Sequence, residues 1–118
     1  MRYALLIHGN GSERRGLQTE ERTQLRQAEL PAWRTLLAEL GRVDRGAESF
    51  ELRPPGEARV VRVRRGETIV SNGPIIETSE ALGGLFLIDL PDLDEAIRLA
   101  ALVPAAGTGS VEIRPVAS

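Results

Sequence analysis

The chain has 118 residues, a formal net charge of −2 at pH 7 and no cysteine. This length suits one hydrophobic core, so we expect a single domain over residues 1–118. The absence of cysteine excludes disulfides, thiolate zinc sites and cysteine nucleophiles. All 15 basic residues are arginine, which also excludes a Schiff-base lysine and the lysine of a phosphate-binding loop.

Residues 2–8 are predicted to form the first strand. Apolar side chains lie on both of its faces, a pattern typical of a central strand. The strand ends at His8, the only histidine in the chain. The apolar run at residues 3–7 is too short for a signal peptide, and no segment reaches the length of a membrane span. We therefore expect a soluble cytoplasmic protein with no membrane partner.

A helix is predicted from Thr19 to about Leu40, with a kink or a new start at Pro31. In its second half, apolar side chains recur with the helical period, at Trp33, Leu36, Leu37 and Leu40. Gly41 lies where a C-terminal cap is expected. The stripe places Trp33 in the core.

Residues 59–64 and 67–71 alternate between apolar and polar side chains around Arg65-Gly66, which predicts a β-hairpin with a tight turn. The arginines of this segment, which also allow a nucleic-acid stripe, are Arg59, Arg62, Arg64 and Arg65. The chain is acidic overall, and no aromatic side chain is interleaved with these arginines. We favour an exposed strand face paired with Glu57 and Glu67, and expect no nucleic-acid partner.

The last third of the chain predicts a strand over residues 84–89, a helix and a final strand over residues 110–116. Asp92 and Glu95 form a capping box at the start of the helix, and Pro104 ends it. The helix face expected to be apolar contains Leu93, Ala96, Ile97 and Ala100.

The element order is therefore β, α, β-hairpin, β, α, β, which is the split βαβ pattern of ferredoxin-like α+β domains. In that fold the first strand is central and antiparallel to the strands at 84–90 and 110–116. Helices cover one face of the sheet. The other face is left open, so we expect it to be covered by a partner.

Short motifs along nearly the whole chain match a known family. They are Tyr3-Ala4-Leu5-Leu6-Ile7, Val61-Arg62-Val63-Arg64 with Arg65-Gly66, Asn72-Gly73-Pro74, Glu77-Thr78, Glu80, Leu82-Gly83-Gly84, Leu87-Ile88-Asp89, Asp94-Glu95-Ala96 and Val111-Glu112-Ile113-Arg114-Pro115-Val116. Together they resemble the YCII-related proteins, specifically the branch named after its DGPF loop. The resemblance implies a ferredoxin-like fold whose sheets pair into a dimeric α+β barrel, with a cleft between sheet and helices or at the dimer interface.

The chain departs from the family pattern at two places. Some members of the wider family resemble hydrolases built around a histidine on the first helix, but no histidine lies between Thr19 and Leu40. In the naming loop, Asn72 replaces the expected aspartate, Ile75 and Ile76 replace a Phe-Ala pair, and Ser79 replaces lysine. The hydrolase activity is therefore not carried over to this chain.

His8 is the one side chain whose unperturbed pKa suits proton transfer near neutrality. The ferredoxin-like topology brings it near the starts of the strands at Gly84 and Ser110, and so near the loop at 71–84. We assign His8 and Glu77 as candidate catalytic residues. The candidate ligand-binding residues are Asn72, Glu80, Gly83 and Ser110.

Structural alternatives exist for several of these residues. A histidine at a strand end is more often a surface or hydrogen-bonded structural residue, and for Glu77 we favour a cap for loop amides. The Gly73-Pro74 and Gly83-Gly84 pairs suit a sharp chain exit and a close backbone approach. One histidine and scattered carboxylates give no recognisable metal-ligand spacing, so we expect neither metal nor cofactor.

Two functions follow. The first is a dimeric regulatory or binding module for a small organic ligand or a protein partner. Similar proteins are associated with alternative sigma factors, which implies a transcription-linked partner. The second is a cofactor-free enzyme in which His8 is the general acid or base and a glutamate orients it. The absent helix histidine favours the first; a pocket at His8 with a carboxylate in hydrogen-bond reach would favour the second.

Overall fold

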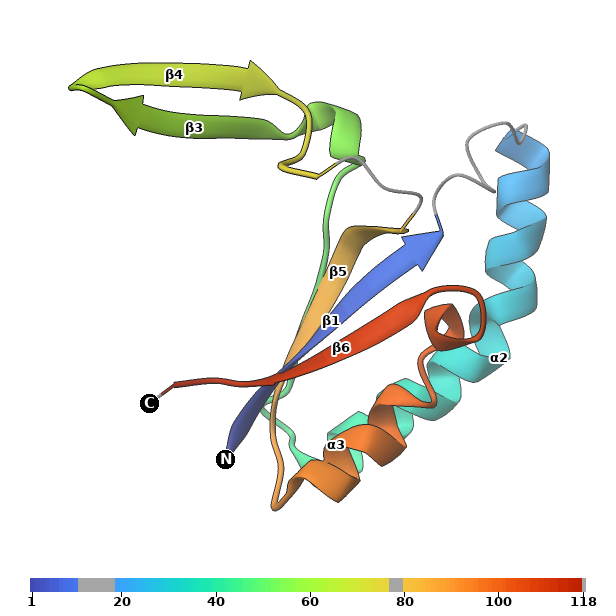
Figure 1. Ribbon diagram of the computed structural model, residues 1–118. Helices are drawn as coiled ribbons and strands as arrows, with labels where there is room; N and C mark the ends of the chain where they lie inside the picture. The colour runs from blue at the N-terminus through green and yellow to red at the C-terminus, as the bar shows by residue number, and fades with distance from the viewer. Residues whose placement is uncertain (11–18, 77–79, 118) are drawn as a thin grey trace.

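The computed structural model describes residues 1–10, 19–76 and 80–117. Its elements are β1 (Arg2–Asn10), α2 (Thr19–Val43), β2 (Glu48–Glu51), the 3₁₀ helix η1 (Pro55–Glu57), β3 (Arg59–Arg64), β4 (Glu67–Asn72), β5 (Glu80–Asp89), α3 (Leu93–Ala100), the 3₁₀ helix η2 (Pro104–Gly107) and β6 (Ser110–Pro115) (Figure 1).

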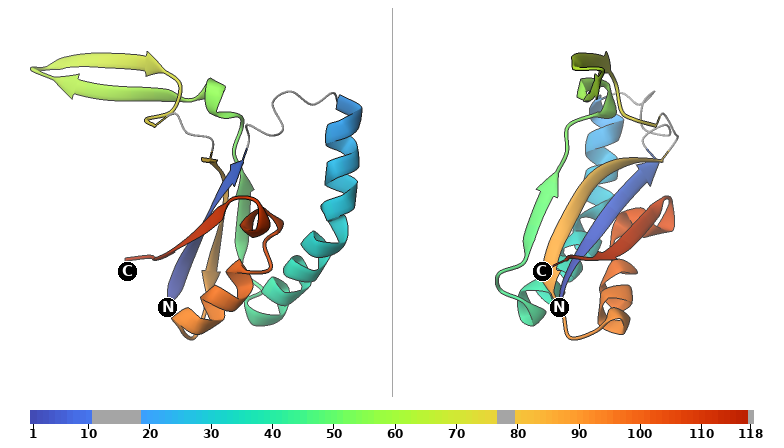
Figure 2. Two further views of the ribbon diagram at one scale, coloured as in Figure 1. Left: turned by 45° about the vertical axis from the view of Figure 1, so that its right-hand side comes forward. Right: turned by 60° about the vertical axis from the view of Figure 1, so that its left-hand side comes forward.

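The main sheet has four antiparallel strands in the order β2-β5-β1-β6. β1 pairs with β5 on one side and with β6 on the other, so the predicted central position of the first strand is confirmed. Helices α2 and α3 lie on one face of this sheet, and the opposite face is open (Figures 1 and 2). This arrangement agrees with the predicted ferredoxin-like α+β fold.

The hairpin lies outside the main sheet, contrary to the topology expected from its place in the chain. Among the described strands, β3 and β4 form a separate two-stranded sheet. Along the chain, the strand that joins the main sheet after β1 is β2, which pairs with β5. The hairpin itself is confirmed, because Arg65 and Gly66 take φ values of 51° and 78°, as a two-residue turn requires.

Helix α2 continues through Pro31 as one 25-residue helix that is visibly bent (Figure 1), so no new helix starts there. It also continues past Gly41, because the Asp44 amide donates to the Leu40 carbonyl at 2.8 Å. The predicted cap at Gly41 is therefore wrong. The predicted cap of α3 is confirmed, since Asp92 accepts the Glu95 amide at 2.9 Å. Within the described residues, neither helix is long and apolar enough to cross a membrane.

The core lies between the helices and the covered face of the sheet. Its buried side chains are Tyr3, Leu5, Leu36, Leu40, Phe86, Ile88, Leu90, Ala96, Leu99 and Val103. Trp33 is half-buried against this cluster, and its ring centroid lies 6.3 Å from that of Phe86. Leu37, from the same predicted stripe, is instead exposed.

The buried face of α3 differs from the predicted one. Leu93 and Ile97 are 51% and 50% exposed. Ala96, Leu99 and Ala100 are the buried residues of the helix, and their spacing of three and four residues places them on one helical face. The predicted apolar face was counted from Leu93, the first residue of the helix. It is therefore rotated about the helix axis relative to the face that is buried.

Ion pairs and hydrogen bonds fasten the two helices to each other and to the sheet. Arg98 on α3 bonds to Glu39 on α2 at 3.0 Å and to Glu95 at 2.6 Å. Hydrogen bonds from arginines, Arg42 first and then Arg98, lower the pKa of Glu39. The Asp44 carboxylate accepts the amides of Asp89 and Gly46, in that order the main causes of its lowered pKa. Asp44 thus joins the end of α2 to the end of β5.

Candidate functional site: a cleft at the base of the hairpin

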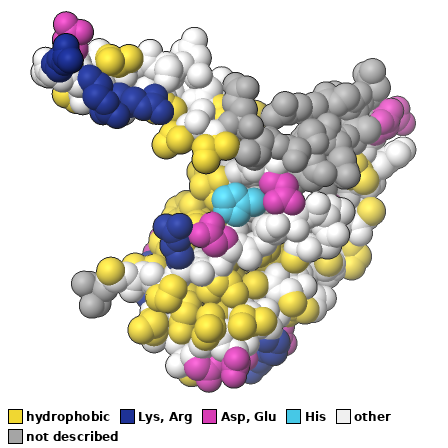
Figure 3. Space-filling view, in the orientation of Figure 1, with side chains coloured by type: hydrophobic (Ala, Val, Ile, Leu, Met, Phe, Trp, Pro, Cys, Tyr) yellow, Lys and Arg dark blue, Asp and Glu magenta, His cyan; other side chains and the backbone are white. Residues whose placement is uncertain are grey.

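A cleft of about 770 Å³ separates the base of the hairpin from the nearby end of the main sheet. Figure 3 shows the corresponding notch between the hairpin and the body of the protein. The cleft wall is mostly apolar and consists of Leu52, Pro54, Pro55, Ala58, Pro74, Ile75, Ile76, Ala81 and Leu82. Its polar side chains are His8, Arg53, Glu57 and Glu80. An apolar cavity with a few polar groups is the usual form of a small-molecule site.

A β-bulge sets the position of His8 in this cleft. In the β1–β5 ladder, Ile7 pairs with Gly84 but His8 pairs with Leu82, so Gly83 is the extra residue. On the other side, His8 pairs with Ser110 of β6. Residues paired across a ladder share one face, so His8, Leu82 and Ser110 all lie on the open face of the sheet.

The His8 ring is held by a carboxylate from the last strand. Its Nε2 lies 3.2 Å from Oε1 of Glu112, and the other Glu112 oxygen accepts from Nε of Arg114 at 3.1 Å. An ionised carboxylate only accepts hydrogen bonds, so Nε2 donates and Nδ1 of the neutral ring keeps its lone pair. The His8 side chain is 29% exposed. This arrangement gives a ring with fixed orientation and one nitrogen able to take up a proton.

The other candidate site residues lie in different places. Ser110 donates its hydroxyl to Oε2 of Glu80 at 3.1 Å, so both are together beside His8 at the end of the sheet. Asn72 pairs with Arg59 at the base of the hairpin. Gly83 occupies the bulge, where its carbonyl accepts the Leu52 amide at 2.8 Å. Glu77 lies outside the described residues.

The glycine pairs act on the backbone, as their alternative interpretation predicted. The chain leaves the hairpin at Gly73, which has a φ of 91°, a conformation that favours glycine. A Cβ on Gly84 would lie 2.8 Å from the Phe50 carbonyl oxygen, so glycine allows β2 to approach β5 at this point. Both pairs thereby shape the walls of the cleft.

Sequence reasoning missed Glu112, Arg114 and the wall at residues 52–58. A signal for the first two is present, because alternation places Ser110, Glu112 and Arg114 on one face of the last strand. Because the last strand pairs antiparallel with the first strand, Glu112 then lies diagonally across from His8 on the same face of the sheet. The predicted pairing of Glu57 with the arginines of the hairpin was also wrong, since Glu57 accepts from Arg53 at 3.0 Å.

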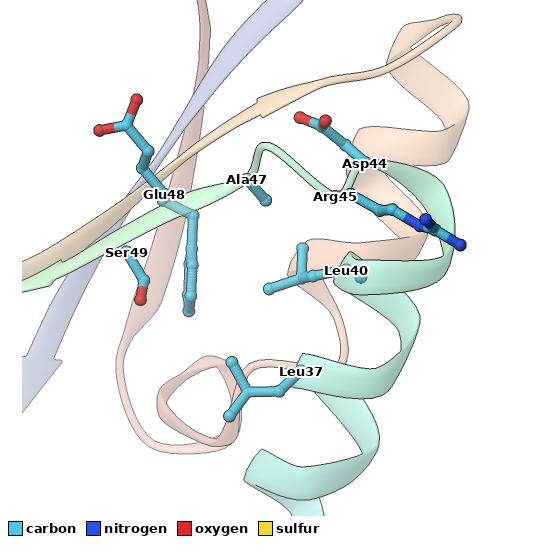
Figure 4. A pocket seen from close by; sticks show the side chains of 9 residues that line it. Leu37, Leu40, Asp44, Arg45, Ala47, Glu48 and Ser49 are labelled. Carbon is cyan, nitrogen blue, oxygen red and sulfur yellow. The ribbon is translucent and has the colours of Figure 1, made fainter.

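A second, smaller hollow of about 140 Å³ lies between the C-terminal part of α2 and β2. Figure 4 shows the side chains of Leu37, Leu40 and Ala47 around it, with the carboxylates of Asp44 and Glu48 directed away from it. Asp44 is already committed to the amides of Asp89 and Gly46. This hollow therefore offers an apolar floor without polar groups that converge on a ligand.

Metal-ligating groups do not cluster in the part of the chain that the structure describes: no three acidic or histidine side chains there are placed to hold an ion.

A model of the YCII-related domain matches residues 1–118. An uncharacterized protein of Rhizobium meliloti (strain 1021) is 37% identical over 119 residues, which cover 99% of this chain and 93% of that protein.

Proposed function

Since the chain belongs to the YCII-related domain family, we propose that it is a dimeric domain that binds a small organic molecule in the cleft at the base of the hairpin. The observation that carries this proposal is the cleft itself, which joins a wide apolar wall to the polar side chains of His8 and Glu80. A ligand in it would bury an apolar body against Ile75, Leu82 and their neighbours.

The charges of the cleft favour a neutral or cationic ligand. Arg53, the one arginine among the described residues that line it, is paired with Glu57. Glu80 adds a carboxylate, and Nδ1 of His8 is an acceptor. A ligand with a hydroxyl or amine donor fits these groups better than an anion, because an anion would meet acceptors at the polar end.

The proposed dimer forms through the open face of the sheet. The centre of this face is apolar and consists of Ala4, Leu6, Phe50, Leu85 and Leu87, which the ladders align across three strands. Phe50 is 48% exposed. Charged groups surround the centre, including the Arg2–Glu48 pair. A contiguous apolar face with a polar border is the usual composition of a protein interface.

Binding can be tested with N-phenyl-1-naphthylamine, a neutral apolar probe with one N–H donor that fluoresces in apolar surroundings. The wild-type protein is expected to enhance its fluorescence saturably. Ile76→Arg, which adds a charge to the cleft wall, should weaken the probe's affinity at least about tenfold, equivalent to about 1.4 kcal/mol. Leu93→Arg on α3 is the matched control. Equal affinities for both variants would contradict the cleft as the site.

The His8–Glu112–Arg114 chain favours a second function, cofactor-free acid–base catalysis. The probe reaction is the ring opening of 5-nitrobenzisoxazole, in which a base removes the ring C–H proton and the N–O bond breaks. We expect the wild type to accelerate it and His8→Gln to lose on the order of 10²-fold or more. Glu112→Gln should lose less, since Nδ1 remains. Asp94→Asn, at an exposed position on α3 outside the cleft, is the control, and wild-type rates in His8→Gln would exclude this function.

A further inference from the structure

The hairpin of residues 59–72, called the arm below, extends away from the rest of the domain. It projects from the side of the sheet opposite the helices, over the open face (Figures 1 and 2). Among the described residues, its strands pair with each other and not with the main sheet. A lone two-stranded hairpin is at best marginally stable in water, so the arm needs a surface to pack on.

One face of the arm carries exposed apolar side chains. The register places Val61 opposite Val70 and Val63 opposite Thr68, so these β-branched side chains share one face. Val61, Val63 and Val70 are 61%, 59% and 57% exposed. Arg62, Arg64, Glu67 and Ile69 lie on the other face. The arm therefore has the two-sided pattern of a strand pair that is covered on one side.

The dimensions of the domain match an arm that reaches into a partner. The radius of gyration is 16.3 Å, whereas a compact domain of this length has about 13.5 Å. The thinnest extent of the chain is 19 Å. Each arm strand has six residues and so spans about 20 Å, while sheets packed face to face are about 10 Å apart. The arm is thus long enough to pass a partner's sheet and reach its helices.

Charge indicates which surface the arm meets. Its four arginines and one glutamate give the arm +3, whereas the whole chain carries −2, so the rest of the chain carries −5. The arm is therefore electrostatically complementary to the body of another copy and repels another arm. This argues for arm-on-body packing within a pair of identical chains.

We infer that the apolar face of the arm packs on the body of a second copy that sits on the open sheet face. This inference rests on the dimer proposed above. Ala58, Pro74 and Ile75, at the base of the arm, line the cleft. The partner that holds the arm therefore also fixes one wall of the ligand site, and ligand binding and dimer formation strengthen each other.

The test measures the dimer dissociation constant of full-length variants by sedimentation equilibrium. Val61→Asp, on the apolar face of the arm, should raise this constant at least about tenfold. Ile69→Asp, on the opposite face of the same arm, should change it less than about threefold. Leu85→Asp, at the centre of the sheet face, should give a monomer. Equal effects of Val61→Asp and Ile69→Asp would overturn the role assigned to the arm.

A second measurement locates the contact. Because the chain has no cysteine, Val63→Cys can be labelled at one position with benzophenone maleimide and photo-crosslinked. Crosslinks are expected between chains, to residues outside 59–72; crosslinks between two arms would overturn the inference. A wild type that stays monomeric overturns both the dimer and the arm contact. Retained binding of N-phenyl-1-naphthylamine in that monomer would still support the cleft.

Discussion

Gly109→Ala is expected to destabilise the protein by about 1–3 kcal/mol and to displace His8. A Cβ at this position would clash with the carbonyl oxygen of His8 and lie 3.2 Å from Cα of Gly9 and 3.3 Å from the Ala105 carbonyl oxygen. All three are backbone atoms, so a side-chain rotation cannot relieve the clash. The end of β1 must move away from β6, and the contact between His8 and Glu112 is lost with it.

Gly107→Ala is the matched control, because a Cβ there meets no atom within 4 Å. Both variants are compared by urea unfolding, for stability, and by binding of N-phenyl-1-naphthylamine, for the cleft. We expect Gly107→Ala to behave as the wild type in both assays. If Gly109→Ala unfolds at the same urea concentration as the control, the close approach of residue 109 to β1 is wrong.

Ile88→Ala is expected to lower the free energy of unfolding by about 2–5 kcal/mol, since it removes a large buried side chain and leaves a cavity. Ile88 is fully buried, belongs to the core cluster and pairs with Tyr3 of the central strand. The space it fills lies between the sheet and the helices, where rigid elements on both sides limit collapse. Urea unfolding followed by circular dichroism gives the difference.

The same substitution at Ile97 is the control, because this side chain is half-exposed on α3. Ile97→Ala should change the stability by less than about 0.5 kcal/mol. A comparable loss in both variants would mean that Ile97 is covered, and would restore the α3 face that the sequence pattern predicted.

Local patterns predicted much of this fold. The hairpin was predicted from alternation around Arg65-Gly66, and the start of α3 from the side chain of Asp92, because each depends on neighbours within a few residues. The central position of β1 followed from its two apolar faces together with the order of elements. These features are encoded where they occur in the chain.

Features that depend on distant contacts were harder to predict. β2 has four exposed residues and is a strand because β5 pairs with it, so its own pattern is weak. The position of the hairpin outside the main sheet depends on tertiary contacts, which the alternation of apolar and polar residues does not reveal. The partner of His8 is 104 residues away, and only the register of β1 and β6 brings it close. The carboxylate that contacts His8, Glu112, was therefore not among the candidate residues, and Glu77 lies outside the described residues.

The edges of the main sheet limit how copies of this chain can assemble. One edge is β2, which is only four residues long, and the other is β6, which ends at Pro115. A short strand and a proline are both poor templates for a further strand. Growth of the main sheet by strand addition, which would continue without limit, is thereby disfavoured. The contact proposed above, through the open face of the sheet, would be self-complementary and complete at two copies, so it would give a closed assembly and not a fibre.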